Sequence, residues 1–457
     1  MVRLLIAVIS IFLAALPVQS ASLLRFGGGG NPMALASVTI GSNAFYNSGI
    51  NDNQLGKSEL HSYNGKQYVC YLNTSLVPVV VIRTLSNNTF TTTNTGLPAS
   101  TSDLHESCAI GIDPNGYIHI AYGMHTGPLS SWYYRSSSPG VASSWVGPMG
   151  MLGTNESSVT YPIFFNNPST GQLYFTFRFG SSGGGNQFFY AYNAGTTTWV
   201  AAAGTATAGL LVQGIGVTPS NNAYFNGQPK WDPVTGKLWW SWEYNNNQNG
   251  TGEPAYQFLA QWNGTTFKDI NGSVITIPQT WNNSVPVYGD GSTSTHYSSL
   301  QEFDVYNGIF YIGVTHDDTN AITQSYVITN FGGTFAERVL TTWMANPSPN
   351  CVFGFCSIGV APAFVGQQIF LVLADADNVS GHTIAMTSND GFNTDKRTYV
   401  IMNHSNPNWE MVKDSTDTRT GLLSFIWMDA DDTQGGYTYT FTTTAGSLFA
   451  LDWTPPE

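Results

Sequence analysis

Four residues of the sequence carry the side chains that an acid–base reaction on a sugar acid requires: His105, His125, Tyr161 and Arg178. A uronic acid in a polysaccharide can be cleaved by β-elimination, in which the C5 proton is removed, negative charge develops on the carboxylate, and the oxygen on C4 departs. A guanidinium can neutralise that carboxylate through two parallel hydrogen bonds. A neutral histidine can take the proton, and a tyrosine or the second histidine can protonate the departing oxygen. The set supplies one group for each task, so we expect no metal at the site and no cofactor; a structural calcium ion is left open.

The two histidines stand at the two ends of one hairpin, HESCAIGIDPNGYIHIAYGMH, residues 105–125. Its DPNG turn is expected to set Ile112 against Tyr117, which brings His105 opposite Met124, one step from His125. Directly opposed residues lie about 5 Å apart and diagonal ones about 7–8 Å. Two imidazoles at that spacing could straddle a small ligand, and which of them is the base stays open.

The next hairpin, YPIFFNNPSTGQLYFTFR, repeats this arrangement. Its turn centres near Ser169, so Tyr161 is expected to face Phe177, next to Arg178. Tyr161 and Arg178 then lie at the same end of their hairpin as His105 and His125 do in theirs.

A unit made of a glycine-containing turn and a strand-rich run recurs seven times. Its glycines are Gly65, Gly116, Gly171, Gly236, Gly308, Gly366 and Gly421. The runs are rich in Val, Ile, Tyr, Phe and Trp and are flanked by turn residues, and no segment shows capped helical periodicity. This pattern predicts an all-β fold, a seven-bladed β-propeller, with two tandem β-sandwiches as the alternative. Neighbouring blades present equivalent strand ends to one face, so the four groups are expected to meet near the central channel.

Other hairpins place further polar groups at this end. In the fourth unit we expect Glu243 and Tyr244 opposite Phe225 and Tyr224, and a shift of one residue would turn each side chain to the other face. The predicted substrate-binding residues are Tyr224, Glu243, Tyr244, His296 and His316.

The amino terminus has the pattern of a secretory signal: one basic residue, the apolar run LLIAVISIFLAALP, and small residues before Ala21. We therefore expect a signal peptide over residues 1–20 and a single propeller domain over residues 21–457. No later run is apolar and long enough for a membrane helix. The mature protein is expected to be secreted, extracellular and monomeric.

The cysteines and the glycosylation sequons fit this compartment. An even number of cysteines in a secreted chain predicts two disulfides, Cys70–Cys108 and Cys351–Cys356, and their spacing matches no zinc motif. Nine Asn-x-Ser/Thr sequons are candidate glycosylation sites. They are at Asn73, Asn87, Asn155, Asn249, Asn263, Asn271, Asn282, Asn378 and Asn403.

The charge balance argues against two classes of partner. The net charge is −13, and only 15 residues are Lys or Arg, with no basic stripe, so nucleic acid and anionic membrane are not expected partners. Aromatic residues make up 14 % of the chain and charged residues 9 %, which suits a secreted β scaffold that presents aromatic surfaces to sugars.

The stretches DLHESCAIGIDPNGYIHIAYGMHTGPLSSWYYRSSSPG and SVTYPIFFNNPSTGQLYFTFRFGSSGGGNQ resemble the propeller polysaccharide lyases, which include bacterial ulvan lyases and fungal L-rhamnose-α-1,4-D-glucuronate lyases. The motif-level similarity covers roughly residues 100–195, and the spacing HxxxxxxIxxxGxIHxxxGxH is its most specific part. In these lyases a histidine pair, a tyrosine and an arginine form the site, which implies the same roles for His105, His125, Tyr161 and Arg178. The resemblance further implies a metal-independent elimination that leaves a 4,5-unsaturated uronate.

The low charge and the many sequons depart from the bacterial ulvan lyases. They favour a secreted eukaryotic member that acts on rhamnose-capped glucuronate in gum arabic-type arabinogalactan, so a uronate-containing polysaccharide is the expected partner, with ulvan as the alternative substrate. A sialidase would need three arginines on one carboxylate, and only Arg178 of the seven in the mature chain is expected at an inner hairpin end. A glycan-binding propeller lectin is the non-catalytic alternative. Its blades would carry near-identical sites, whereas the polar groups here differ from blade to blade.

Overall fold

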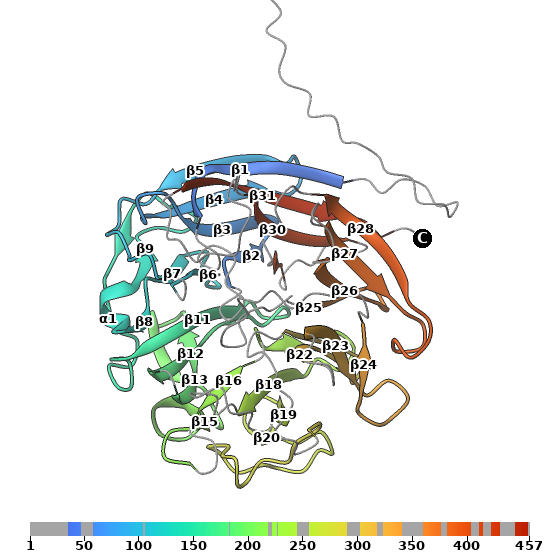
Figure 1. Cartoon of the computed structure of the whole chain (residues 1–457). Coiled ribbons are helices and arrows are strands. Elements are labelled where there is room, and N and C mark those ends of the chain that lie inside the picture. Colours follow the sequence, from blue (N-terminus) through green and yellow to red (C-terminus); the bar gives the residue numbers. More distant parts are fainter. Residues whose placement is uncertain are drawn as a thin grey trace, which may run out of the picture.

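The β-rich runs of the sequence pair into antiparallel sheets that stand side by side around a ring (Figure 1). The computed structural model describes residues 35–46, 58–103, 106–181, 183–217, 222–225, 227–244, 256–289, 302–317, 323–340, 360–375, 382–403, 411–414, 422–429 and 444–455. These residues form seven sheets, which we number 1 to 7 in chain order.

Of the first three sheets, sheet 3 contains the candidate catalytic residues His125, Tyr161 and Arg178. Sheet 1 consists of β2 (Leu60–Tyr63), β3 (Lys66–Leu72), β4 (Pro78–Thr84) and β5 (Thr89–Asn94). Sheet 2 consists of β6 (Cys108–Ile112), β7 (Ile118–Tyr122), β9 (Tyr133–Ser136) and β10 (Trp145–Val146), and the short helix α1 (Leu129–Trp132) precedes β9. Sheet 3 consists of β8 (His125–Gly127), β11 (Val159–Asn166), β12 (Leu173–Ser181), β13 (Gly184–Asn193), β14 (Thr198–Ala201) and β15 (Leu210–Gln213), with the 3-10 turn η1 (Thr207–Gly209) before β15.

The other four sheets complete the ring. Sheet 4 consists of β16 (Ala223–Phe225), β17 (Lys230–Trp231), β18 (Leu238–Tyr244), β19 (Tyr256–Trp262) and β20 (Phe267–Lys268). Sheet 5 consists of β21 (Phe303–Tyr306), β22 (Ile309–Asp317), β23 (Thr323–Thr329) and β24 (Ala336–Val339). Sheet 6 consists of β25 (Val360–Val365), β26 (Gln368–Asp375), β27 (His382–Thr387) and β28 (Arg397–Asn403). Sheet 7 consists of β29 (Met411–Lys413), β30 (Leu423–Asp429), β31 (Thr444–Trp453) and β1 (Leu35–Tyr46).

Sheet 7 closes the ring because it combines both ends of the chain. Strand β1 pairs antiparallel with β31, from Leu35 opposite Trp453 to Tyr46 opposite Thr444. Figure 1 shows the blue β1 beside the red β31. The C-terminal segment thus closes the fold against the N-terminal one.

The hydrophobic core is divided into clusters that lie between neighbouring sheets. One cluster joins Ala109 and Ala121 of sheet 2 to Phe164 and Phe175 of sheet 3, and others join every further pair around the ring. The pair formed by the last and the first sheet includes Ile426 and Tyr71. Because each sheet buries both faces against its neighbours, the fold is an all-β propeller and not a tandem of sandwiches. The prediction of an all-β propeller is confirmed, and the seven sheets of the described residues agree with the blade count that the repeats predict.

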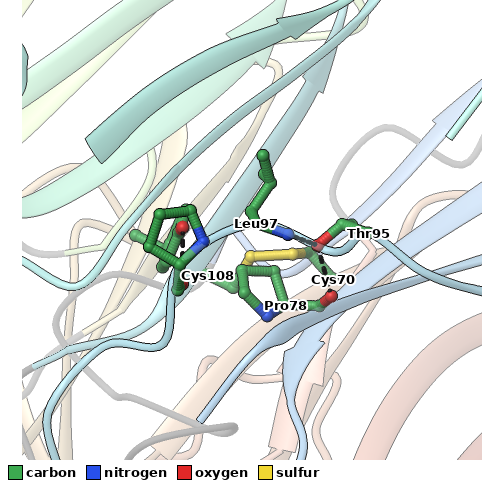
Figure 2. The surroundings of a disulfide bond; sticks show 7 residues. Cys70, Pro78, Thr95, Leu97 and Cys108 are labelled. Atoms are coloured by element: carbon green, nitrogen blue, oxygen red, sulfur yellow. Dashed lines mark hydrogen bonds between the residues drawn. A yellow bond between two sulfur atoms is a disulfide. The ribbon is translucent and has the colours of Figure 1, made fainter. Parts of the chain in front are cut away.

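A buried disulfide between Cys70 and Cys108 joins strand β3 of sheet 1 to β6 of sheet 2, and this predicted bridge is confirmed (Figure 2). Beside it Thr95 donates a hydrogen bond from its hydroxyl to the carbonyl oxygen of Pro78, 2.7 Å away. The disulfide anchors β6, the strand that follows the segment carrying His105. The second predicted bridge, between Cys351 and Cys356, lies outside the described residues.

Of the residues in the predicted signal peptide and glycosylation sequons, the structure describes only part. The expected signal peptide, residues 1–20, lies outside them, and so do Asn249 and Asn378. Five sequon asparagines are exposed: Asn87, Asn155, Asn263, Asn271 and Asn282. Asn73 is buried, and its carboxamide oxygen accepts hydrogen bonds from the backbone of Ser75 and Val77; Asn403 ends β28. Within the described part of the chain, no helix is long and apolar enough to cross a membrane.

Candidate active site

The hairpin that carries His125 pairs one residue away from the predicted register. Ile112 lies opposite Ile118 and not Tyr117, because the turn is one residue longer than expected. Asp113 causes the difference: its carboxylate accepts hydrogen bonds from the backbone N–H groups of Asn115 and Tyr117, which keeps Tyr117 in the turn. His119, in the middle of this hairpin, is fully buried.

His125 does not stay in the sheet of its hairpin. After β7 the chain bends at Gly123, whose φ of 65° is in the left-handed region, and β8 then pairs with β11 of sheet 3. A Cβ on Gly123 would lie 3.0 Å from the Trp132 side chain. Glycine suits this bend because it adopts a positive φ without strain and because it has no Cβ to meet Trp132. His125 therefore belongs to the same sheet as Tyr161 and Arg178, which corrects the prediction that it lies in the preceding blade.

A row of opposed residues crosses sheet 3. His125 pairs with Thr160, Thr160 with Arg178, and Arg178 with Gln187. His125 and Arg178 therefore lie on either side of Thr160 in this row, and the register of β8 and β11 shifts between Val159 and Thr160. Neighbouring strands lie about 4.8 Å apart, and His125 and Arg178 are two strands apart. Their Cα atoms therefore lie about 10 Å from each other. A sugar ring with its carboxylate fits between two groups at that spacing.

Tyr161 occupies a β-bulge directly after Thr160. The register of β11 and β12 shifts between Thr160 and Ile163, and Tyr161 has a φ of 54°. A non-glycine residue in this region costs about 1–3 kcal/mol and is held by its surroundings. The prediction that Tyr161 faces Phe177 is wrong, because a bulge re-aims the side chain in a way that strict alternation does not anticipate.

The phenol of Tyr161 is held in its protonated form. The side chain is only 9 % exposed. Burial raises the pKa of Tyr161 far above its ordinary value, Tyr224 raises it further, Arg178 opposes the rise, and Asp103 adds to it. These electrostatic interactions place Tyr161 near Arg178, Tyr224 and Asp103. A protonated phenol can donate a proton or a hydrogen bond but is a poor base.

Arg178 is a buried cation whose protein partners are neutral. The side chain of Asn222 accepts hydrogen bonds from Nη2 at 2.6 Å and Nε at 3.3 Å, and the carbonyl of Ser181 accepts one from Nη2 at 2.6 Å. The guanidinium lies over the ring of Tyr224, 4.8 Å from its centroid. Only 4 % of Arg178 is exposed, yet none of the ion pairs in the described part of the chain includes it, and its Nη1 makes no hydrogen bond there. A buried arginine without a carboxylate partner is unusual and suits an anionic ligand.

The pocket for this guanidinium depends on Gly185. A Cβ at this position would lie 2.3 Å from Nε of Arg178 and 2.7 Å from Oδ1 of Asn222. Glycine therefore allows β13 to approach the arginine. Asn222 pairs with Gly185 of the same strand in an isolated parallel β-bridge. Gly185 therefore shapes the site.

Asp103 contacts the other end of the row. Its Oδ2 lies 2.7 Å from Nδ1 of His125, and both side chains are partly exposed. Asp103, Asn222 and Thr160 were not among the predicted site residues. Asp103 stands two positions before His105 in the sequence, and only the contact with His125 distinguishes it from other loop carboxylates.

The predicted substrate-binding residues lie in different surroundings. Tyr224 is beside Arg178 and pairs with Glu243, so the predicted pairing of Tyr224 with Tyr244 is off by one residue. Glu243 is buried and accepts a hydrogen bond from Gln257. Tyr244 packs in the core between sheets 3 and 4 and donates its hydroxyl to backbone carbonyls, including that of Gln279 at 3.0 Å.

Three predicted site residues remain: His105, His296 and His316. His105 and His296 lie outside the described residues. His316 is in β22, opposite Gln324. Within the described residues, no three His, Cys, Asp or Glu side chains gather as ligands would around a metal ion.

Two solved structures that resemble this chain are of an ulvan lyase of polysaccharide lyase family 25. The structure bound to -[GlcA(1-4)Rha3S]- has 14 % sequence identity and a TM-score of 0.59, and the similarity covers 81 % of this chain and 88 % of that one. The second has 14 % identity and a TM-score of 0.61, covering 85 % of this chain and 93 % of that one. At this level of identity the likeness is one of fold. No curated protein matches the sequence.

A family model described as "BNR repeat-containing family member" matches residues 66–343. This match includes β3 to β5 of sheet 1, all of sheets 2 to 5 and the whole row from His125 to Gln187, and it spans more than half of the 457 residues. The chain therefore belongs to the BNR repeat-containing family.

Proposed function

We propose that this protein is a secreted polysaccharide lyase. It cleaves the bond between L-rhamnose and the 4-position of D-glucuronate by β-elimination, and it leaves a 4,5-unsaturated uronate. The observation that carries the proposal is Arg178, a buried guanidinium without a carboxylate partner among the described residues. It can bind the uronate carboxylate through Nη1 and stabilise the charge that develops there in the transition state.

The neighbours of Arg178 supply the proton transfers. His125, in the same row of sheet 3, takes the C5 proton, and Tyr161, protonated because it is buried, protonates the departing C4 oxygen. His105, predicted beside them, is the second imidazole of the site. These side chains account for every proton and charge in the reaction, so the proposed mechanism is metal-independent.

Tyr224 has a supporting role in this mechanism. Its ring stacks on the guanidinium of Arg178 and fixes the plane in which the nitrogen atoms point. Asn222 fixes the same plane through its two hydrogen bonds. A guanidinium that is already oriented loses little freedom when the carboxylate binds to Nη1, which favours binding.

The proposed natural substrate is a rhamnose-capped glucuronate of gum arabic-type arabinogalactan, from which the enzyme releases rhamnose. The low content of charged residues and the sequons support this choice. Ulvan is the second candidate, because the two similar solved structures are of an ulvan lyase.

The decisive experiment incubates the purified protein with gum arabic and, separately, with ulvan. The unsaturated uronate is followed by its ultraviolet absorbance, and free rhamnose is measured in the same samples. The expected result is a rise in absorbance with gum arabic that the Arg178→Ala variant does not produce. A rise with ulvan alone would reassign the substrate. Glycan binding without any rise in absorbance or released sugar would contradict the lyase and support a lectin.

A further inference from the structure

The contact between Asp103 and His125 joins two separately anchored segments. Nδ1 of His125 lies 2.7 Å from Oδ2 of Asp103, the length expected of a charge-assisted hydrogen bond. The carboxylate can only accept this hydrogen bond, so the ring places its proton on Nδ1.

The loop that carries Asp103 is held by its own hydrogen bonds. The carboxylate of Glu106 accepts from the backbone N–H and from the hydroxyl of Thr101, each at 2.9 Å. The N–H of Glu106 donates in turn to the carbonyl of Asp103 at 3.1 Å. Two residues later Cys108 forms the buried disulfide with Cys70. Hydrogen bonds among Thr101, Asp103 and Glu106 thus hold the backbone of Asp103 in place.

The backbone of His125 is held from the other side. His125 pairs with Thr160, and the hydroxyl of Thr160 accepts a hydrogen bond from the N–H of Thr126 at 2.9 Å. Thr126 has a φ of 63°, so this short strand departs from regular extended geometry immediately after His125. Because both partners are fixed independently, their contact defines the orientation of the ring.

We propose that Asp103 is a positioning residue that keeps the proton of neutral His125 on Nδ1 and thereby makes Nε2 the basic nitrogen. This inference rests on the proposed function, in which His125 takes the C5 proton. A histidine that exchanged its tautomer or rotated would present an N–H to the C5 proton for part of the time and could not accept it. The carboxylate also stabilises the imidazolium that forms when the proton is transferred.

The test compares Asp103→Ala with Asp395→Ala. Asp395 is a matched control, because its side chain is 38 % exposed against 36 % for Asp103 and it lies beside Arg397 of sheet 6. The kinetic readout is kcat and KM on the substrate that the absorbance assay identifies. The spectroscopic readout is the tautomer of His125, read from long-range ¹H–¹⁵N correlations of histidine-labelled protein and assigned with a His125→Gln sample.

The expected result for Asp103→Ala is a fall in kcat of about tenfold to a hundredfold with little change in KM, as for other carboxylate–histidine pairs. The neutral ring should change from the Nδ1–H to the Nε2–H form, whereas Asp395→Ala should leave both readouts as in the wild type. An unchanged tautomer or an unchanged kcat in folded Asp103→Ala would overturn the inference. If the wild type shows no lyase activity, the proposed function fails, but the tautomer measurement still decides whether Asp103 orients His125.

Discussion

His125 and Arg178 are both opposed to Thr160, which is the one residue between them in the row that crosses sheet 3. Their relative position is set by backbone pairing, which is more precise than contact between loops. The four-strand row is thus a rigid base on which a sugar acid can be held between a proton acceptor and a cation.

Replacement of Arg178 by alanine should lower kcat by about a hundredfold to a thousandfold, because the charge that develops on the carboxylate loses its stabilising cation. Steady-state kinetics on the cleaved glycan measure this effect. Arg135→Ala is the matched control, since Arg135 also lies over a tyrosine ring, Tyr117, at 5.0 Å but is on sheet 2. Equal losses in the two variants would show that the effect comes from folding.

Each histidine should contribute separately to the rate. His105→Ala and His125→Ala are each expected to lower kcat by at least about a hundredfold, the usual effect of removing a general acid or base. The comparison also assigns the base, because the variant that lacks it should show the larger loss and should not recover at higher pH. A rate close to that of the wild type in His125→Ala would transfer the role of base to His105.

Tyr161→Phe should lower kcat by about a hundredfold and leave the bulge intact, because only the hydroxyl is removed. Tyr174→Phe, a buried tyrosine on β12 of the same sheet, is the control and should keep its activity. Burial raises the pKa of Tyr161 above its ordinary value of 10.0, so the phenol keeps its proton throughout the usual assay range. The pH–rate profile should therefore show no loss of activity from tyrosine ionisation below about pH 10. A basic limb that disappears in Tyr161→Phe would contradict this assignment.

The free energy of unfolding should fall when the protein is acidified below about pH 6.5. Burial lowers the pKa of His61 from 6.5 to about 3, and burial also lowers the pKa of His119. The unfolded chain therefore binds protons that the folded chain does not, and each histidine can contribute up to about 1.4 kcal/mol of lost stability per pH unit. Urea unfolding between pH 7 and pH 5 measures the slope. It should be smaller in His61→Gln, and an identical slope in that variant would contradict the attribution to His61.

Removal of the disulfide in a Cys70→Ala and Cys108→Ala double variant should lower the free energy of unfolding by about 2–5 kcal/mol. The bridge spans a sequence separation of 38 residues and links sheet 1 to sheet 2. Its loss increases the conformational freedom of the unfolded chain and removes a covalent link between the two sheets. Urea unfolding again provides the measurement. The corresponding Cys351→Ala and Cys356→Ala variant tests the second predicted bridge, and an unchanged stability there would contradict that bridge.

The sequence predicts the fold better than it predicts the site geometry. Recurring glycine turns and β-rich runs were sufficient for the propeller, because hairpin formation is local and each run must bury both faces. The register around Ile112 was off by one residue, because hydrogen bonds from the backbone to the side chain of Asp113 decide how many residues the turn contains. The register around Tyr224 was off by one residue, because the pairing with β18 shifts between β17 and β16. The bulge at Tyr161 and the transfer of β8 to sheet 3 follow from contacts between blades, which a pattern within one hairpin does not contain. Asp103 was missed for the same reason.

The transfer of β8 has a mechanical consequence. A proton acceptor that stayed with its own hairpin would change its separation from the guanidinium whenever the two adjacent blades rocked against each other. Because β8 pairs with β11, such a movement would carry the imidazole, the phenol and the guanidinium together, and the backbone would adjust at the bend at Gly123, outside this row.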